Sequence, residues 1–168
     1  LGIIPDNKEL IKKILIKSAK TADAIITSGG VSVGQADYMK EVLAELGNVL
    51  FWKLSIKPGR PMAYGKIKSA SYFGLPGNPV AAMVTFYQLV QPALKYLKGE
   101  LNYLPPPIIN VKSDALIKKK PGRLEFQRGI LSQNKDGLSV KPTNLQGSAI
   151  LSSMTQANCF IILDLESG

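Results

Sequence analysis

The loop from Ser28 to Asp37 combines glycines, small polar residues and one carboxylate directly after an apolar run. Residues 24–27 predict a strand, and residues 38–46 predict an amphipathic helix. A strand, a glycine-rich loop and a helix in this order present backbone N–H groups to an anion. The carboxylate of Asp37 could hold a metal ion that bridges to a phosphate. The alternative is a tight turn in which the glycines only supply positive φ angles, and this loop alone does not decide between the two.

Two further loops follow predicted strands. Lys57–Pro61 carries two cations between prolines, and Gly74–Pro79 leads into a predicted helix. Ligands of open α/β sheets bind beyond the carboxyl ends of the strands, so we expect all three loops and Asp6 to converge on one rim. Cations beside carboxylates around a phosphate favour magnesium-assisted phosphoryl chemistry. The recurrence of such loops therefore favours an anion site.

Several of these residues also have ordinary structural explanations. Asp6 can be a helix cap. Lys53 can lie exposed on a strand beside Trp52, and Lys57 and Arg60 can be plain turn cations. Without further information the residues support an α/β domain that binds a phosphorylated ligand.

The residue inventory excludes several classes of site. The chain has no histidine, which excludes a Ser-His-Asp triad and a histidine-ligated zinc. Its single cysteine, Cys159, excludes an intramolecular disulfide and fits a reducing cytoplasm. Any metal must be held by oxygen ligands, which favours Mg²⁺ over zinc. Neither the G-x-G-x-x-G nor the G-x-x-x-x-G-K-[ST] pattern occurs, so nicotinamide and P-loop enzymes are disfavoured.

The charge of the chain suits an anionic partner. The net charge of +9 arises from 21 lysines and arginines against 12 acidic residues. The cations are scattered, except for the run Lys118–Lys120, and nothing resembles a basic helix or an aromatic-studded RNA-binding strand. We therefore expect a small anionic ligand and no nucleic acid. No apolar run reaches the roughly 20 residues of a membrane span, so we expect no membrane partner and a cytoplasmic location.

Residues 1–100 predict an α/β domain with a mostly parallel or mixed sheet covered by helices on both faces, a three-layer arrangement. Besides residues 38–46, helices are expected from Asp6 to about Ser18 and from Val80 to about Leu97, the latter with Asn78 as its N-cap. Strands are expected at Leu1–Ile4, Ala24–Thr27 and Asn48–Ile56, and a hairpin at Pro61–Lys66 and Ser71–Leu75.

Residues 105–168 predict a second, all-β domain. Three prolines at 105–107 form a stiff linker, and helical periodicity disappears beyond them. Short β-prone runs separated by turn residues indicate a small barrel or sandwich, which leans on the first domain because about 60 residues bury little surface alone. The runs are Ile108–Val111, Leu124–Leu131, Leu138–Val140 and Cys159–Leu165.

Taken together, these motifs resemble the molybdopterin molybdenumtransferases, a family of molybdenum-cofactor enzymes related to the carboxyl-terminal domain of gephyrin. The resemblance rests first on the three loops, Thr27–Tyr38, Lys57–Pro61 and Gly74–Pro79. It continues in the β domain and so covers essentially the whole chain. The motifs there are Pro121–Arg123, Phe126–Gly129 and Gln146–Ser148.

The resemblance implies the reaction and the site. Such enzymes take adenylylated molybdopterin and molybdate as substrates, cleave the adenylate with Mg²⁺, place molybdenum on the dithiolene and release AMP. By motif position, Asp37 and Asp6 correspond to the magnesium-associated acids, and Lys53 and Lys57 neutralise charge on the phosphate or pterin. The remaining implied ligand-binding residues are Ser28, Gly29, Gly30, Ser32, Arg60, Gly77, Asn78, Arg128 and Ser148.

Within that set the oxyanion molybdate is assigned to Arg60, Arg128 and Ser148, because arginine and hydroxyl donors suit an anion of charge two. No local structural need for an arginine at 128 is evident from the sequence. The alternative is that Gln127–Gly129 and Gln146–Ser148 are plain strand ends.

The chain departs from the family pattern in its length, since family members are roughly twice as long and form homodimers. We therefore expect a carboxyl-terminal fragment that is inactive alone. Two other functions stay open: a pterin-binding scaffold module without turnover, and the molybdopterin adenylyltransferase of the same pathway. The attached β domain argues against the adenylyltransferase.

Overall fold

A computed structural model describes residues 1–31, 38–100 and 102–166. Two of the predicted site residues, Ser32 and Asp37, lie outside these ranges. Within them, no helix has both the length and the apolar character needed to cross a membrane.

The first sheet contains four strands in the order β1-β5-β4-β2. The strands are β1 (Ala24–Ser28), β2 (Gly47–Lys53), β4 (Pro61–Ile67) and β5 (Ala70–Leu75). β1 runs parallel to β5, whereas β4 pairs antiparallel with both β5 and β2. The α/β class is thus confirmed, but the sheet is mixed rather than mostly parallel, because β4 and β5 form the predicted hairpin and β2 returns along its edge.

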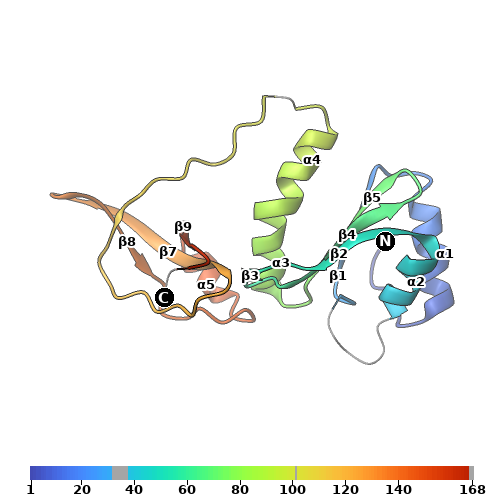
Figure 1. Cartoon of the computed structure of the whole chain (residues 1–168), viewed down its shortest axis with the longest axis horizontal. Helices are drawn as coiled ribbons and strands as arrows, with labels where there is room; N and C mark the ends of the chain where they lie inside the picture. The colour runs from blue at the N-terminus through green and yellow to red at the C-terminus, as the bar shows by residue number, and fades with distance from the viewer. Residues whose placement is uncertain (32–37, 101, 167–168) are drawn as a thin grey trace.

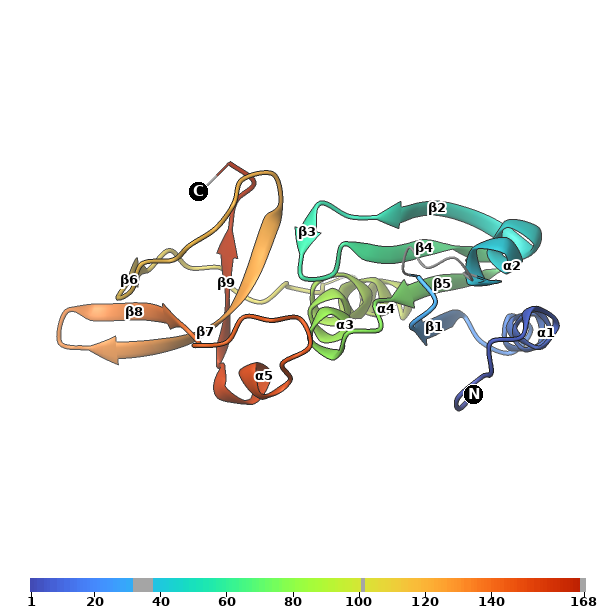
Figure 2. The same cartoon turned by 90° about the horizontal axis from the view of Figure 1, so that it is seen from below.

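Helices cover both faces of this sheet. On one face α1 (Lys8–Ser18) and α2 (Tyr38–Leu46) bury Ile11, Leu15, Val42 and Leu43 against the sheet. On the other face lies a continuous helical segment of α3 (Pro79–Thr85), a π-helical turn η1 (Phe86–Val90) and α4 (Gln91–Leu97), with Val90 buried. Alternate residues of β5 point to the two cores, Tyr72 to one and Phe73 to the other, as the twofold period of a strand requires. The three-layer arrangement is visible in Figures 1 and 2.

Salt bridges tie α1 to α2 at the surface. Lys8 Nζ lies 2.9 Å from carboxylate oxygens of both Glu41 and Glu45, and Lys12 Nζ lies 2.6 Å from Glu45. Hydrogen bonds from Lys12 and Lys8 lower the pKa of Glu45 to about 2. The network holds the two helices in register over the buried core.

The second sheet is built around the long strand β7 (Leu124–Asn134), in the order β3-β7-β8-β6 with β9 on the other edge of β7. Its other strands are β3 (Ile56–Lys57), β6 (Lys112–Ser113), β8 (Gly137–Pro142) and β9 (Cys159–Leu163). The strand β3 precedes the predicted domain boundary, yet it pairs with β7. Figure 2 shows it between the two sheets. Phe126 of β7 packs against Val80 and Val84 of α3, so α3 is buried between the sheets.

Several predicted elements differ from the observed ones. Residues 1–4 belong to no strand, although β1 lies at the open edge of the first sheet. The run 48–56 is divided between β2 and β3, which belong to different sheets. The predicted strand 108–111 is extended but unpaired, and pairing is limited to Lys112–Ser113. The short helix α5 (Ser152–Gln156) was not predicted.

Candidate functional site

The loops after β1 and β5 and the loop before β4 lie at the same end of the first sheet, as expected, and the predicted residues there line two pockets. The first, about 410 Å³, lies beside the loop after β1 and includes Asp6, Ser28, Gly29 and Gly30. The second, about 570 Å³, lies between the start of α3 and the second sheet. Its predicted residues are Lys57, Arg60, Asn78, Arg128 and Ser148. We call them the glycine-loop pocket and the basic pocket.

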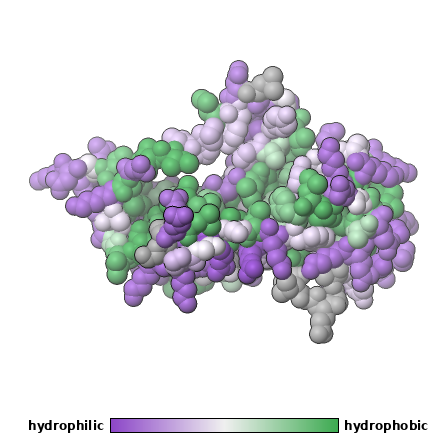
Figure 3. All heavy atoms as spheres, viewed as in Figure 1, coloured by the Kyte–Doolittle hydropathy of each residue, from purple (hydrophilic) through white to green (hydrophobic). Residues whose placement is uncertain are grey.

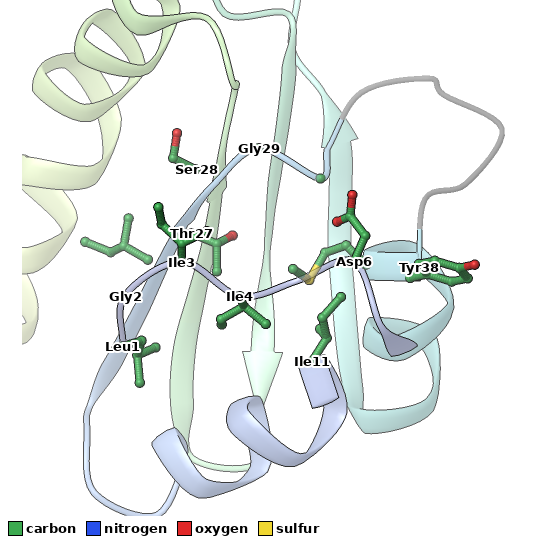
Figure 4. A pocket seen from close by; sticks show the side chains of 13 residues that line it. Leu1, Gly2, Ile3, Ile4, Asp6, Ile11, Thr27, Ser28, Gly29 and Tyr38 are labelled. Atoms are coloured by element: carbon green, nitrogen blue, oxygen red, sulfur yellow. The ribbon is translucent and has the colours of Figure 1, made fainter. Parts of the chain in front are cut away.

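The glycine-loop pocket has a polar edge and an apolar floor. The backbone at Gly29 and Gly30 adopts φ angles of 89° and 69°, which glycine reaches without strain. Apolar side chains of Ile4, Ile11 and Met39 also line the pocket. Figure 4 shows Asp6 on the side nearer Tyr38, with Ser28 on the opposite side. This combination suits a ligand with both an apolar and an anionic part.

Asp6 is not the cap of α1. The neighbouring Asn7 occupies the N-cap, and its side-chain oxygen accepts a hydrogen bond of 2.9 Å from the Leu10 N–H. The simplest structural explanation of Asp6 is therefore removed. Its carboxylate is exposed and lines the glycine-loop pocket.

The loop between β3 and β4 forms one wall of the basic pocket. It approaches α3 so closely that a Cβ atom at Gly59 would lie 2.5 Å from Thr85 Cγ2. Gly59 also has a φ angle of 108°, so only glycine fits both the packing and the backbone. The tight turn fixes Lys57 and Arg60 on either side of it.

Lys57 is paired with a carboxylate that the predicted site did not include. Its Nζ lies 3.0 Å from Oε1 of Glu125, and the Glu125 side chain is only 7% exposed. Gln127 Nε2 donates to the same oxygen at 3.1 Å. The charge of Lys57 is therefore largely compensated within the protein.

Arg128 is buried, with 1% of its surface exposed, and its guanidinium is held by protein groups. Nε donates to Ser153 Oγ at 3.1 Å, and Nη2 donates to the carbonyl of Gly147 at 3.3 Å. Burial lowers the pKa of Arg128, and the Glu125 carboxylate opposes that shift. The structure thus supplies a local reason for an arginine here, contrary to the sequence-based interpretation.

The loop that contains Gly147, which Arg128 contacts through its side chain, is also held by hydrogen bonds between Gln146 and the Arg128 backbone. The Gln146 side chain accepts from the Arg128 N–H at 2.9 Å and donates to the Arg128 carbonyl at 2.8 Å. This pairing places Ser148 at the start of α3, where its carbonyl accepts from the Val80 N–H at 3.2 Å. Asn78 occupies the N-cap position but, instead of capping the helix, donates its Nδ2 to Ser148 Oγ at 3.1 Å.

Two arginines of the basic pocket, Arg60 and Arg123, are exposed. Within residues 1–31, 38–100 and 102–166, neither guanidinium makes a hydrogen bond or an ion pair. Arg60 was among the predicted site residues, whereas Arg123 was not. Their uncompensated charges leave this pocket electropositive despite the Lys57–Glu125 pair.

The remaining predicted residues lie apart from these walls. Lys53 is exposed on β2, opposite Pro61, and lines neither pocket. Gly77 lies in the loop between β5 and α3, where its nearest neighbour across the fold is Gly29. The described residues contain no group of three or more acidic, cysteine or histidine residues that could hold a metal ion.

The predicted site omitted Arg123, Glu125 and Gln146, which line the basic pocket. A signal for the first two was available, because the polar residues at 123, 125 and 127 alternate along a β-prone run and so share one face of the strand. Gln146 had no such signal, since its role depends on a contact with Arg128, 18 residues away.

Comparison with known proteins identifies two family matches. Residues 1–96 match the family described as "Probable molybdopterin binding domain", and residues 110–168 match the "MoeA C-terminal region (domain IV)". Among curated proteins, the molybdopterin molybdenumtransferase of Haemophilus influenzae is 48% identical over 169 residues, which covers 100% of this chain and 42% of the relative. Gephyrin of Dictyostelium discoideum is 35% identical over 191 residues and is covered to 27%. The chain thus spans less than half the length of these relatives.

Solved structures of molybdenum cofactor biosynthesis proteins have a similar fold. A molybdenum cofactor biosynthesis protein from Pyrococcus furiosus superposes with a TM-score of 0.71 at 26% identity, covering 99% of this chain and 54% of that one. A moeA protein from Pyrococcus horikoshii gives a TM-score of 0.72 at 27% identity, covering 99% of this chain and 37% of that one.

Proposed function

Because the chain belongs to the molybdopterin molybdenumtransferase family of molybdenum cofactor biosynthesis, we propose that it is the part of such an enzyme that binds adenylylated molybdopterin and molybdate. In the longer protein molybdenum would be placed on the dithiolene and AMP released. The observation that carries this proposal is the basic pocket of about 570 Å³, in which the guanidinium groups of Arg60 and Arg123 have no partner among the described residues. A doubly charged oxyanion is the ligand that such a pair suits.

In this proposal molybdate lies in the basic pocket. Arg60 contacts it directly, Ser148 offers a hydroxyl, and Arg128 acts from the pocket wall, where it also holds the loop that carries Ser148. Lys57 contributes less because Glu125 compensates its charge. Lys53 remains a candidate only for a ligand that extends beyond the pocket, since it lies exposed on β2.

The adenylate is assigned to the glycine-loop pocket. The backbone N–H of Gly30 supplies a donor for a phosphate. The Gly29 N–H and the Ser28 hydroxyl donate to the carbonyls of Leu75 and Pro76, so either would contribute only by exchanging that bond for one to the ligand. The donor set fits Mg²⁺, which proteins hold through one or two carboxylates together with substrate phosphates. Asp6, and Asp37 outside the described residues, would hold the ion, which when bound neutralises charge on the phosphate.

The domain division and the dimer are part of the same proposal. We assign residues 1–100 to a molybdopterin-binding domain and 105–168 to a β domain. The strand β3 belongs to the first domain by sequence but pairs with β7 in the sheet of the second. A compact monomer of 18.2 kDa exposes about 8,100 Å², whereas this chain exposes 10810 Å². Figure 3 shows hydrophobic side chains on the surface over the helical segment from α3 to α4. That excess exceeds a standard interface of about 800 Å² per partner. The rest of the longer protein or a second copy of it would cover this surface, and we propose that the longer protein is a homodimer.

One experiment tests the proposal. The purified chain is titrated with molybdate and with adenylylated molybdopterin by calorimetry, and AMP release is followed in parallel with a relative of full length. We expect the chain to bind both ligands weakly and to release no AMP above a buffer control, because it spans 42% of the Haemophilus influenzae relative. Absence of any binding would refute the proposed function.

The test also addresses the alternatives. A pterin-binding module without turnover predicts no AMP release by the full-length protein either. An adenylyltransferase would form the adenylate from ATP, and the match of residues 110–168 to the MoeA C-terminal region favours the molybdenumtransferase instead.

A further inference from the structure

The outer face of α1 carries three exposed lysines. Lys13 and Lys17 are about one helical turn apart, and Lys20 follows in the turn after the helix. The helical period places Lys13 and Lys17 on the side of α1 away from the buried Ile11 and Leu15. In the part of the chain that the structure describes, none of the three ammonium groups makes a hydrogen bond or an ion pair. Figures 1 and 2 show α1 at the outer margin of the molecule.

Two other lysines of α1 are explained by the fold, and the outer ones are not. Lys8 and Lys12 face α2, where both form ion pairs with Glu45. Lys13 and Lys17 instead form a like-charge pair at a spacing of four residues, which destabilises a helix. Only Lys17 gains from its place in the last turn, where the helix dipole favours a cation. The stability of the helix therefore does not account for this row of charges.

A fourth exposed lysine, Lys68, lies in the turn between β4 and β5. Its φ angle is 55°, and among the residues that the structure describes it is the only one besides glycines with a positive φ angle. Two-residue hairpin turns favour glycine or asparagine at such a position. The turn is joined to the segment after α1, because the Ser71 N–H donates to the Asp23 carbonyl at 2.8 Å. Lys68 and Lys20 therefore lie at the same end of the first sheet.

We propose that Lys13, Lys17, Lys20 and Lys68, which we call the lysine face, form a docking surface for a protein with an acidic surface. Two exposed acids border the lysine face. Glu9 lies about one turn before Lys13, and Asp23 lies three residues after Lys20. Positive charge therefore predominates, and carboxylates are its complement.

The composition of the lysine face favours a protein over a nucleic acid or a membrane. Residues 9–23 and 66–71 contain no arginine and no aromatic residue. The bidentate phosphate contacts and base stacking that are typical of nucleic-acid sites are therefore not available there. The same two ranges expose no large hydrophobic side chain that would anchor the chain in a membrane.

Docking at the lysine face leaves both pockets open. Lys20 precedes the start of β1, whereas the glycine loop follows the end of that strand, and the basic pocket lies beyond α3. A partner can therefore stay bound while the pockets take up or release their ligands, whatever these are. Exposed ion pairs are individually weak and are screened by salt, so we expect a transient complex that forms rapidly at low ionic strength.

The test measures binding of a short poly-L-glutamate peptide to this chain by calorimetry at increasing salt. One variant reverses three charges of the lysine face: Lys13→Glu, Lys17→Glu and Lys20→Glu. The matched control makes the same change in net charge at exposed lysines of the second sheet: Lys112→Glu, Lys135→Glu and Lys141→Glu. We expect the lysine-face variant to bind the peptide roughly tenfold or more weakly than the wild type, as for the loss of several exposed ion pairs, and the control to stay within about twofold.

Lys68→Gly separates a docking role from a structural one. Glycine adopts the positive φ angle without strain, so this variant should melt no lower than the wild type in circular dichroism. Its affinity for the peptide should nevertheless fall, by about twofold to fivefold, because one contact is lost. Wild-type affinity would remove Lys68 from the lysine face and contradict the proposal.

Three other results would overturn the proposal. Equal weakening by the two triple variants would show that only net charge matters. Tighter binding of a single-stranded RNA of matched charge, or of phosphatidylserine vesicles, lost in the lysine-face variant, would assign the surface to that partner. Protection of the same lysines from acetylation in the full-length protein, but not in this chain, would show that the rest of the protein covers them. None of these results bears on the pockets, so the proposed function would stand.

Discussion

Replacing Arg128 by alanine tests whether this residue supports the basic pocket or only binds its ligand. The substitution leaves the Ser153 hydroxyl and the Gly147 carbonyl without their donors at 3.1 Å and 3.3 Å, in a position that is 1% exposed. A hydrogen bond to a charged group contributes about 1.5–3 kcal/mol. Because neighbouring contributions do not add fully, we expect a loss of about 2–4 kcal/mol in the free energy of unfolding.

That loss has a measurable size in a chain of this length. A change of 1 kcal/mol shifts the melting temperature of a domain of 150–250 residues by about 2–4 °C, so Arg128→Ala should melt roughly 5–15 °C lower. Molybdate binding should weaken as well, since the loop that carries Ser148 loses one of its two locks. Thermal unfolding by circular dichroism and molybdate titration by calorimetry measure both effects in one preparation.

Arg123→Ala is the matched control. Arg123 lines the same pocket and is exposed, with no hydrogen bond or ion pair in the described ranges. Arg123→Ala should have the melting temperature of the wild type and bind molybdate about tenfold more weakly, as expected for the loss of one charge-assisted contact. If Arg128→Ala also melts with the wild type and changes only molybdate affinity, the supporting role argued here for Arg128 is wrong.

Three further changes test other parts of the structure. Glu125→Gln should strengthen molybdate binding by calorimetry, because it frees the charge of Lys57, and an unchanged or weaker affinity would contradict that electrostatic argument. Asp37→Ala should abolish AMP release by the full-length protein without lowering its melting temperature, and turnover at saturating Mg²⁺ would remove Asp37 from the site. The pKa of Glu45 falls from its usual 4.5 to about 2 in the folded chain, so its contribution to stability is present above pH 4.5 and lost as the pH falls toward 2. Acid titration monitored by circular dichroism should show the stability difference between the wild type and Glu45→Gln shrinking over that interval, and a constant difference would refute the linkage.

The sequence predicted the elements whose determinants are local. The helix α1 follows from its apolar spacing, although its cap is Asn7 rather than Asp6, and the hairpin β4–β5 follows from two β-prone runs around a short turn. The division of residues 48–56 between two sheets could not be predicted, because it depends on the pairing of Ile56 with Leu124, far along the chain. Likewise, periodicity indicated one long helix over 80–97, whereas the π-helical turn at 86–90 interrupts it.

In the candidate site, too, the sequence identified residues but not the contacts between distant parts of the chain. Loop position identified Arg60, and the family resemblance added Asn78 and Ser148; the structure places all three around one pocket. The sequence also led us to expect that the loops converge on a single rim. They do lie at one end of the first sheet, with Ser28 bonded to the Pro76 carbonyl, but their residues line two pockets. The order of strands and loops in the sequence predicts at which end of the sheet a loop residue lies. It does not predict on which side of a neighbouring loop that residue lies.

Counting cations in the sequence also overstates the charge that a ligand meets in the basic pocket. Four basic residues line it, Lys57, Arg60, Arg123 and Arg128. The buried Glu125 pairs with Lys57, and the Arg128 guanidinium donates hydrogen bonds to hydroxyl and carbonyl oxygens of the protein. An anion therefore meets mainly the two exposed arginines, one on the β3–β4 loop and one immediately before β7. The strands beside these two arginines, β3 and β7, are paired in one sheet, with Ile56 opposite Leu124. Binding of a doubly charged oxyanion by both arginines therefore depends on this pairing between residues far apart in the sequence.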